Sequence, residues 1–209
     1  MLLPQKDVTL GLIKIPFPNH PKPQFCTVFY EAAKHFQFFG GKIAQQEDPK
    51  LFQHFARLLQ PKEDDLIRVC FARTLTEKLG YSGKEAQLKI KTFYNAITNK
   101  RSQHLGEVNC TGYAPDSEHN REYTFNLFLP YFKGFSFNDI ILEVSRIPTI
   151  RWYDCDALMT NKDQSGNPIM KELFYKDNDP EKEKIALATV IELFLRDRDS
   201  SLAYLPSSI

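Results

Sequence analysis

The apolar residues that begin at Phe25 recur with the spacing of one face of an α-helix. They fall at i, i+3, i+4, i+7, i+11 and i+14, the period of a helix with one buried stripe. The chain holds 17 phenylalanines against one tryptophan, so aromatic rings supply much of its core. The pattern predicts a helix over residues 25–39 that ends at Gly40-Gly41, and its stripe is Phe25, Val28, Phe29, Ala32, Phe36 and Phe39.

Several further segments combine the helical period with start or stop signals. An Asp-Pro pair opens two of them, because Asp caps free backbone donors and Pro fits the first helical position. Ser82 and Ser136 stand at the cap position of two others. The expected helices lie at about 49–60, 64–79, 82–97, 136–146 and 180–199.

Alternation of apolar and polar side chains, which is typical of strands, occurs around Tyr123, Phe125, Leu127 and Leu129. A weaker strand pattern covers residues 107–113. A polar loop separates the two segments, so they are expected to pair as an antiparallel hairpin. Short strands are also expected at 8–15 and 149–153.

Helices outnumber strands in this reading, so the sequence predicts an α+β fold that is predominantly α-helical. We expect a helical bundle of about five to seven helices with a small antiparallel β-hairpin. Residues 1–24 carry five prolines and should form an extended arm. Residues 25–199 should form a single helix-rich globular domain, with the hairpin inserted at about 105–130, and 200–209 an irregular tail.

Composition narrows the function classes. Lys and Arg number 27 against 26 for Asp and Glu, so no global field favours nucleic acid as a partner. The chain shows neither a run long enough for a membrane helix nor a signal-peptide pattern. Its four cysteines are scattered. These features predict a cytoplasmic protein, although delivery by a specialised secretion system would leave the same pattern.

A cysteine-dependent hydrolase or transferase is one functional hypothesis. Cys26 would lie in the first turn of the expected helix, where free N–H groups stabilise a thiolate. His104, before the first hairpin strand, could serve as its base, and Asn126, on the second strand, could orient that base. His119 is an alternative to His104. The competing interpretation is that Cys26 is a small buried core residue.

A metal site is a weaker hypothesis. Asp154 and Asp156 follow an apolar run, and alternate residues of a strand can present two carboxylates to one Mg²⁺ or Mn²⁺. An Asp turn leading into a loop explains the pair more simply. The histidines lack metal-ligand spacing, and no glycine-rich phosphate loop is present. The sequence therefore predicts no cofactor.

The favoured interpretation is a non-catalytic domain that binds another protein through exposed aromatic residues. A single core need not use every aromatic side chain of this chain, and aromatic residues left on a surface gather at protein interfaces. A second layer of core is the competing explanation. The expected binding surface comprises Phe38, Phe39, Phe128, Tyr131 and Phe132.

Overall fold

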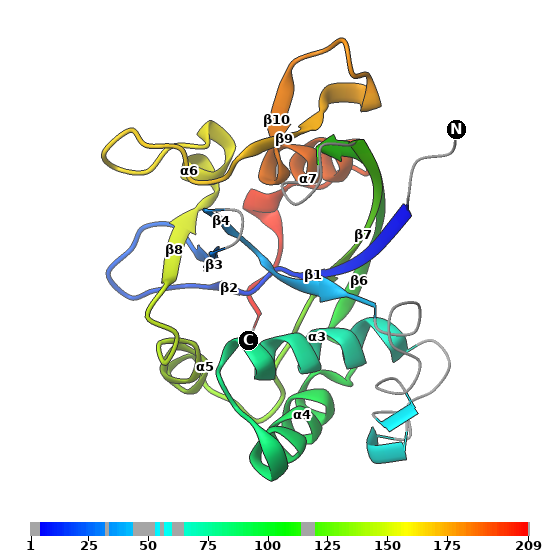
Figure 1. The fold of residues 1–209 in the computed structure, drawn as a ribbon. Coiled ribbons are helices and arrows are strands. Elements are labelled where there is room, and N and C mark those ends of the chain that lie inside the picture. The colour runs from blue at the N-terminus through cyan, green and yellow to red at the C-terminus, as the bar shows by residue number, and fades with distance from the viewer. Residues whose placement is uncertain are drawn as a thin grey trace.

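A computed structural model of the chain describes residues 5–31, 34–43, 53–54, 57–59, 65–113 and 120–208. Its largest element is a six-stranded mixed sheet in the order β10-β9-β6-β7-β1-β5, in which the long strands β6 and β7 curve (Figure 1). Strand β1 runs parallel to β7, and the other neighbours are antiparallel. The strands are β1 Gln5–Gly11, β5 Phe39–Lys42, β6 Gln103–Tyr113, β7 Asn120–Leu129, β9 Glu172–Tyr175 and β10 Lys184–Ala186.

A second, four-stranded sheet is built around β3. Strands β2 and β4 pair with β3, and β8 also pairs with it, all antiparallel. Residues 24–28 of β3 are buried throughout, so this strand is covered on both faces. The strands of this sheet are β2 Lys14–Ile15, β3 Gln24–Tyr30, β4 His35–Gln37 and β8 Ile150–Asp154.

Helices cover the sheets from opposite sides. In Figure 1, α3 and α4 lie together on one side of the molecule, and α7 lies with β9 and β10 on the other. One apolar core joins α3, α4 and α5 to the four-stranded sheet, and a second joins α6 and α7 to the six-stranded sheet. The helices are α3 Leu66–Lys78, α4 Gly83–Ile97, α5 Phe137–Val144, α6 Cys155–Thr160 and α7 Leu187–Arg196, with 3₁₀ turns η2 Lys176–Asn178 and η3 Leu202–Tyr204.

The prediction of a helical bundle is wrong, since the fold centres on the large curved sheet (Figure 1). Within this range, residues 25–30 belong to β3, residues 35–37 form β4, and Phe39 begins β5. A strand buried on both faces loses its apolar–polar alternation, so a short apolar run can imitate helical spacing. Gly40-Gly41 lies within β5 rather than at a helix end. A side chain on Gly40 would meet Leu10 and the carbonyl oxygen of Thr9, so glycine lets β5 approach β1 closely.

Several local predictions are confirmed. Helices α3, α4 and α5 and strand β8 lie where sequence periodicity places them, and β6 and β7 form the expected hairpin. Ser136 and Asp139 form a reciprocal capping box at the start of α5. The last helix, α7, begins at Leu187, because β10 occupies residues that were expected to be helical. The helix predicted at 49–60 lies largely outside the described residues.

Described residues near both ends of the chain pack into the fold. The segment expected as an arm contributes β1 to one sheet and β2 to the other. The expected tail lies against β2, where the backbone N–H of Ser208 donates to the carbonyl of Lys14 at 2.7 Å. The division into arm, domain and tail stays a prediction. Among the described residues, no helix is both long and apolar enough to cross a membrane.

Candidate ligand-binding cleft

A cleft of about 310 Å³ opens over one face of the six-stranded sheet, beside the β3–β4 hairpin. Its apolar floor combines residues from strands distant in sequence with the first residue of α7. Pairing of β1 with β7 sets Val8 opposite Phe125, and both line the cleft. Leu10, Phe174 and Leu187 complete this floor.

A cluster of packed aromatic rings lines part of the cleft. Tyr123 and Phe125 are alternate residues of β7 and therefore project from the same face of the sheet. Their rings are stacked, with centroids 5.5 Å apart and an interplanar angle of 2°. Phe174 meets both rings edge-on at 5.7 and 5.5 Å. Tyr113 and Tyr30 also line the cleft. Aromatic side chains can stack on a planar ring of a ligand.

Four lysines from four segments also line the cleft: Lys6 in β1, Lys42 in β5, Lys78 at the end of α3, and Lys171 just before β9. The ammonium nitrogen of Lys78 lies over the Tyr30 ring, 5.2 Å from its centroid. Among the described residues that line the cleft there is no Asp or Glu. The cleft therefore combines lysine ammonium groups with aromatic rings, a combination suited to an anion that carries a ring.

His35, the first residue of β4, is the titratable imidazole of the cleft. Burial lowers the pKa of His35. A hydrogen bond with the carbonyl of Phe36 at 2.8 Å opposes the shift, and the positive charge of Lys171 adds to it. His35 is therefore neutral at pH 7 and is the one imidazole among the described lining residues.

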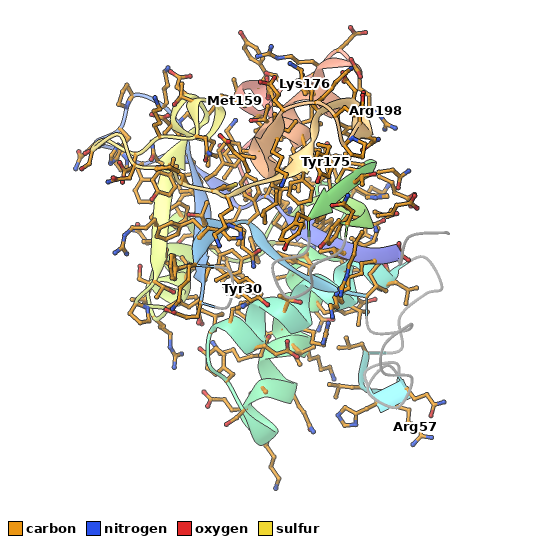
Figure 2. The ribbon with its side chains drawn as sticks, turned by 45° about the horizontal axis from the view of Figure 1, so that its top comes forward. Tyr30, Arg57, Met159, Tyr175, Lys176 and Arg198 are labelled. Carbon is orange, nitrogen blue, oxygen red and sulfur yellow. The ribbon has the colours of Figure 1, made fainter. Side chains whose placement is uncertain are left out.

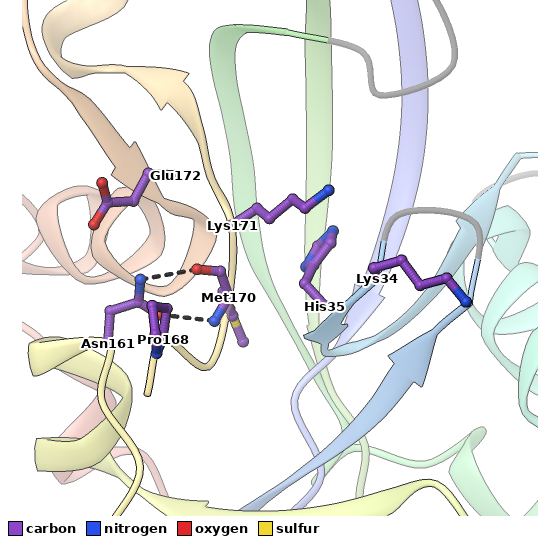
Figure 3. Close-up of a pocket in the computed structure, with 7 residues that line it drawn as sticks. All are labelled: Lys34, His35, Asn161, Pro168, Met170, Lys171 and Glu172. Atoms are coloured by element: carbon purple, nitrogen blue, oxygen red, sulfur yellow. Dashed lines mark hydrogen bonds between the residues drawn. The ribbon is translucent and has the colours of Figure 1, made fainter. Parts of the chain in front are cut away.

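A second hollow of about 380 Å³ adjoins the cleft and shares His35, Met170 and Lys171 with it. Asn161 holds its wall in place: its amide nitrogen donates to the carbonyl of Met170, and its amide oxygen accepts from the Met170 N–H, both at 2.8 Å. Figure 3 shows these two bonds, with Lys171 and His35 reaching toward the same space from opposite sides. Glu172 lies in this second hollow.

The structure does not bring the predicted cysteine, histidine and asparagine together. Cys26 lies in β3 with no exposed surface, and burial raises the pKa of its thiol well above the usual value. His104 is exposed on β6, and Asn126 is buried on β7, both in the other sheet. His119 lies outside the described residues. The prediction of a cysteine-dependent enzyme is wrong, because a buried neutral thiol is neither accessible nor nucleophilic.

The predicted aromatic interaction surface is also wrong, because four of its five members belong to the core. Phe38, Phe39 and Phe128 have no exposed surface, and Phe132 is 1% exposed. Phe128 packs edge-on against the Phe71 ring at 5.4 Å. Tyr131 is half-buried beneath the guanidinium of Arg101. The surplus phenylalanines thus form a second layer of core instead of a docking surface.

The two aspartates of the metal hypothesis have structural partners. The Asp154 carboxylate accepts from the Ala157 N–H at 2.8 Å and caps α6. Asp156 forms an ion pair with Lys22. No cluster of three or more His, Cys, Asp or Glu side chains suited to a metal ion occurs in the described part of the chain.

Sequence reasoning missed the cleft altogether. Lysines are common surface residues, and these four are separated by dozens of positions. The alternation of Tyr123 and Phe125 was visible, but it indicated only a core face. The missing information was strand order, because pairing of β1 with β7 and β5 brings the cleft segments side by side.

No protein-family model matches this sequence, and neither does a curated protein sequence. Among solved structures, the chain is similar to an Ap4A hydrolase from C. elegans, with 12% identity over 77% of this chain and 86% of that one, and a TM-score of 0.38. It is also similar to a Nudix hydrolase from Alicyclobacillus acidocaldarius, with 13% identity over 79% of this chain and 86% of that one, and a TM-score of 0.43. For NrtR from Shewanella oneidensis, the identity is 12% over 74% of this chain and 55% of that one, and the TM-score is 0.39. Likenesses this distant assign neither a family nor an activity to the chain.

Proposed function

We propose that this protein binds a small anionic molecule with a planar aromatic ring, of the nucleotide class, in the cleft over the six-stranded sheet. One observation carries the proposal: four lysines and a cluster of aromatic rings line the same cleft, with no carboxylate among its described lining residues. The lysines would attract the anionic group, and the rings would pack against the planar group.

The size of the cleft supports a ligand of this class. Its volume of about 310 Å³ is at the lower end of small-molecule sites, which span roughly 300 to 1,000 Å³. Stacking on an aromatic side chain contributes about 1 to 3 kcal/mol per base. A hydrogen bond to a charged group adds about 1.5 to 3 kcal/mol. Micromolar binding corresponds to a net free energy of about 8 kcal/mol, so several such contacts must act together to offset the freedom lost on association.

Calorimetric titration with ADP tests the proposal, because ADP combines a planar base with two phosphates. Adenosine and inorganic pyrophosphate each carry half of these features and should bind more weakly than ADP. Lys171→Ala should weaken ADP binding at least about fivefold. Lys91→Ala, an exposed lysine on α4, is the matched control and should leave affinity unchanged.

Two results would overturn the proposal. One is the absence of saturable binding by ADP or pyrophosphate to the folded wild-type chain. The other is equal weakening by Lys171→Ala and Lys91→Ala, which would indicate nonspecific charge attraction. Release of phosphate from ADP, followed in the same samples, reports whether binding leads to hydrolysis. The cytoplasmic location expected from the sequence remains a prediction beside this proposal.

A further inference from the structure

We infer that the cleft holds the anionic group of its ligand directly on lysine ammonium groups, without a bridging divalent cation. Lys78 and Lys171 are the residues assigned this role. The inference rests on the proposed function and specifies how the same site recognises its ligand. It predicts that ADP binds more tightly when Mg²⁺ is removed.

The residues that line the cleft differ from those that usually hold Mg²⁺. Mg²⁺ is usually held by one or two protein carboxylates together with the phosphates of the ligand. The described residues that line the cleft supply no carboxylate, and four of them are lysines. A dication entering this cleft would meet like charge on several sides and would find no anionic protein ligand among them.

Two carboxylates next to cleft residues in the sequence, those of Glu77 and Glu31, are directed elsewhere. Glu77 precedes Lys78 on α3, but successive helical residues project about 100° apart. Its carboxylate faces Arg73 at 3.5 Å, and the Glu77 side chain is 55% exposed. Glu31, next to Tyr30, pairs with Lys34 at 2.8 Å. These contacts leave Lys78 and Tyr30 as the groups that the two elements present to the cleft.

The two assigned lysines are held in place from opposite sides. Lys78 comes from the last turn of α3, where a cation also interacts favourably with the helix dipole, and it lies over the Tyr30 ring. Lys171 lies on the β9 side, close enough to His35 for its charge to lower the pKa of that imidazole. Figure 3 shows Lys171 extending toward His35. An anion between these elements would contact cations from both walls.

Mg²⁺ should therefore compete with the protein for ADP. The cation binds the phosphates in solution and neutralises the charge that the lysines recognise. Titrations of the full chain with ADP in EDTA and in millimolar Mg²⁺ measure this competition. We expect affinity to be about threefold or more higher in EDTA, since a smaller ligand charge weakens attraction to each lysine.

Charge reversal identifies the lysines responsible. Lys78→Glu and Lys171→Glu should each weaken ADP binding in EDTA about tenfold or more, whereas Lys91→Glu on the exposed face of α4 should change it less than about twofold. Melting curves of every variant establish that the fold is retained. Because Lys78 ends a helix, Lys171→Glu provides a second test that does not alter a helix terminus.

The outcomes separate this inference from the proposed function. Higher affinity in EDTA supports direct lysine binding. Equal affinity in the two buffers, or binding that Mg²⁺ tightens or requires, overturns the inference and leaves the proposed function standing. Failure of ADP to bind in either buffer overturns the proposed function instead. Unchanged affinity in both folded charge-reversal variants removes the assignment to Lys78 and Lys171.

Discussion

The ammonium nitrogen of Lys78 lies 5.2 Å from the centroid of the Tyr30 ring. Lys78 is the last residue of α3, and Tyr30 is the last residue of β3, so this contact joins a helix packed on β5 to the β3–β4 hairpin. Both residues line the cleft, and Figure 2 shows Tyr30 beside α3. The ring thus limits where the flexible lysine can place its charge.

Removal of the Tyr30 ring should weaken ligand binding by loosening Lys78. A partly exposed cation–π contact contributes about 0.5 to 1 kcal/mol, so Tyr30→Ala should reduce ADP affinity about two- to fivefold. Tyr30→Phe keeps the ring and should bind nearly as well as wild type. Tyr204→Ala removes a tyrosine that is 86% exposed, and it serves as the control in the same titration. Equal loss in Tyr30→Phe and Tyr30→Ala would contradict the ring contact and point to the hydroxyl.

Ligand binding should take up a proton at His35. Burial, with the nearby charge of Lys171, keeps the pKa of His35 below its ordinary value, so the His35 imidazole is neutral at pH 7 in the absence of ligand. A bound phosphate favours the imidazolium, so His35 should increase the affinity for ADP as the pH falls below neutral. The terminal phosphate of ADP loses charge in the same range, so the wild type must be compared with His35→Gln.

The measurement is the ratio of ADP affinities of wild type and His35→Gln at several pH values. This ratio should rise as the pH falls from neutral toward about 5.5. Without ligand, His35 has the opposite effect: it lowers the stability of the fold as the pH falls. The reason is that the unfolded chain binds the proton more readily than buried His35 does. Acidification should therefore destabilise the free wild type more than His35→Gln. A pH-independent affinity ratio would show that the anion does not approach His35.

The sequence predicts those elements whose signals are local. Ser136 and Asp139 identify the start of α5, and the periodicity of α3 and α4 continues over several turns. Strand β3 could not be recognised in the same way. Its residues 24–28 are all buried, which removes the alternation that distinguishes a half-buried strand. The spacing of Phe25, Val28 and Phe29 then coincides with that of a helix.

The cleft depends on information that no local pattern contains. Lys6 and Tyr123 lie opposite each other because β1 runs parallel to β7, although more than a hundred residues separate them in the chain. Lys78 and Lys171 come from outside that pair of strands. Cys26 illustrates the reverse error: a helix start would have activated it, whereas a buried strand makes it inert. Which strands pair, and which strands are buried, therefore determines which residues line the cleft.

Gly11 should tolerate no side chain, because the ring of Phe71 occupies the space beside it. A β-carbon on Gly11 would lie 2.0 Å from Cε2 of Phe71, and that ring is fully buried between α3 and the sheet. Gly11→Ala should lower the free energy of unfolding by about 1 to 3 kcal/mol, as overpacked cores do. Urea denaturation measures the loss. Adding Phe71→Leu should restore part of it, so the double variant should be more stable than the sum of the two single effects predicts. Strict additivity would contradict a direct clash.

The buried hydroxyl of Tyr94 should stabilise the contact between α4 and the start of α3. It donates to one oxygen of Asp65 at 2.7 Å, and Arg68 donates to the other oxygen at 2.6 Å. Burial and this bond to Asp65 raise the pKa of Tyr94 to about 12, so the hydroxyl keeps its proton at neutral pH. Tyr94→Phe removes one bond to a charged acceptor and should cost about 1.5 to 3 kcal/mol in the free energy of unfolding.

Tyr131→Phe is the matched control for this prediction, because the Tyr131 hydroxyl accepts a hydrogen bond from Arg101 at the surface. Tyr131→Phe should lower the free energy of unfolding by less than about 1 kcal/mol, as the loss of an exposed polar pair does. Asp65→Ala should cost more than Tyr94→Phe, about 3 to 5 kcal/mol, because it leaves Arg68 without its carboxylate in a partly buried position. Equal stability of Tyr94→Phe and Tyr131→Phe in urea would mean that the Asp65 contact contributes nothing to holding α3 and α4 together.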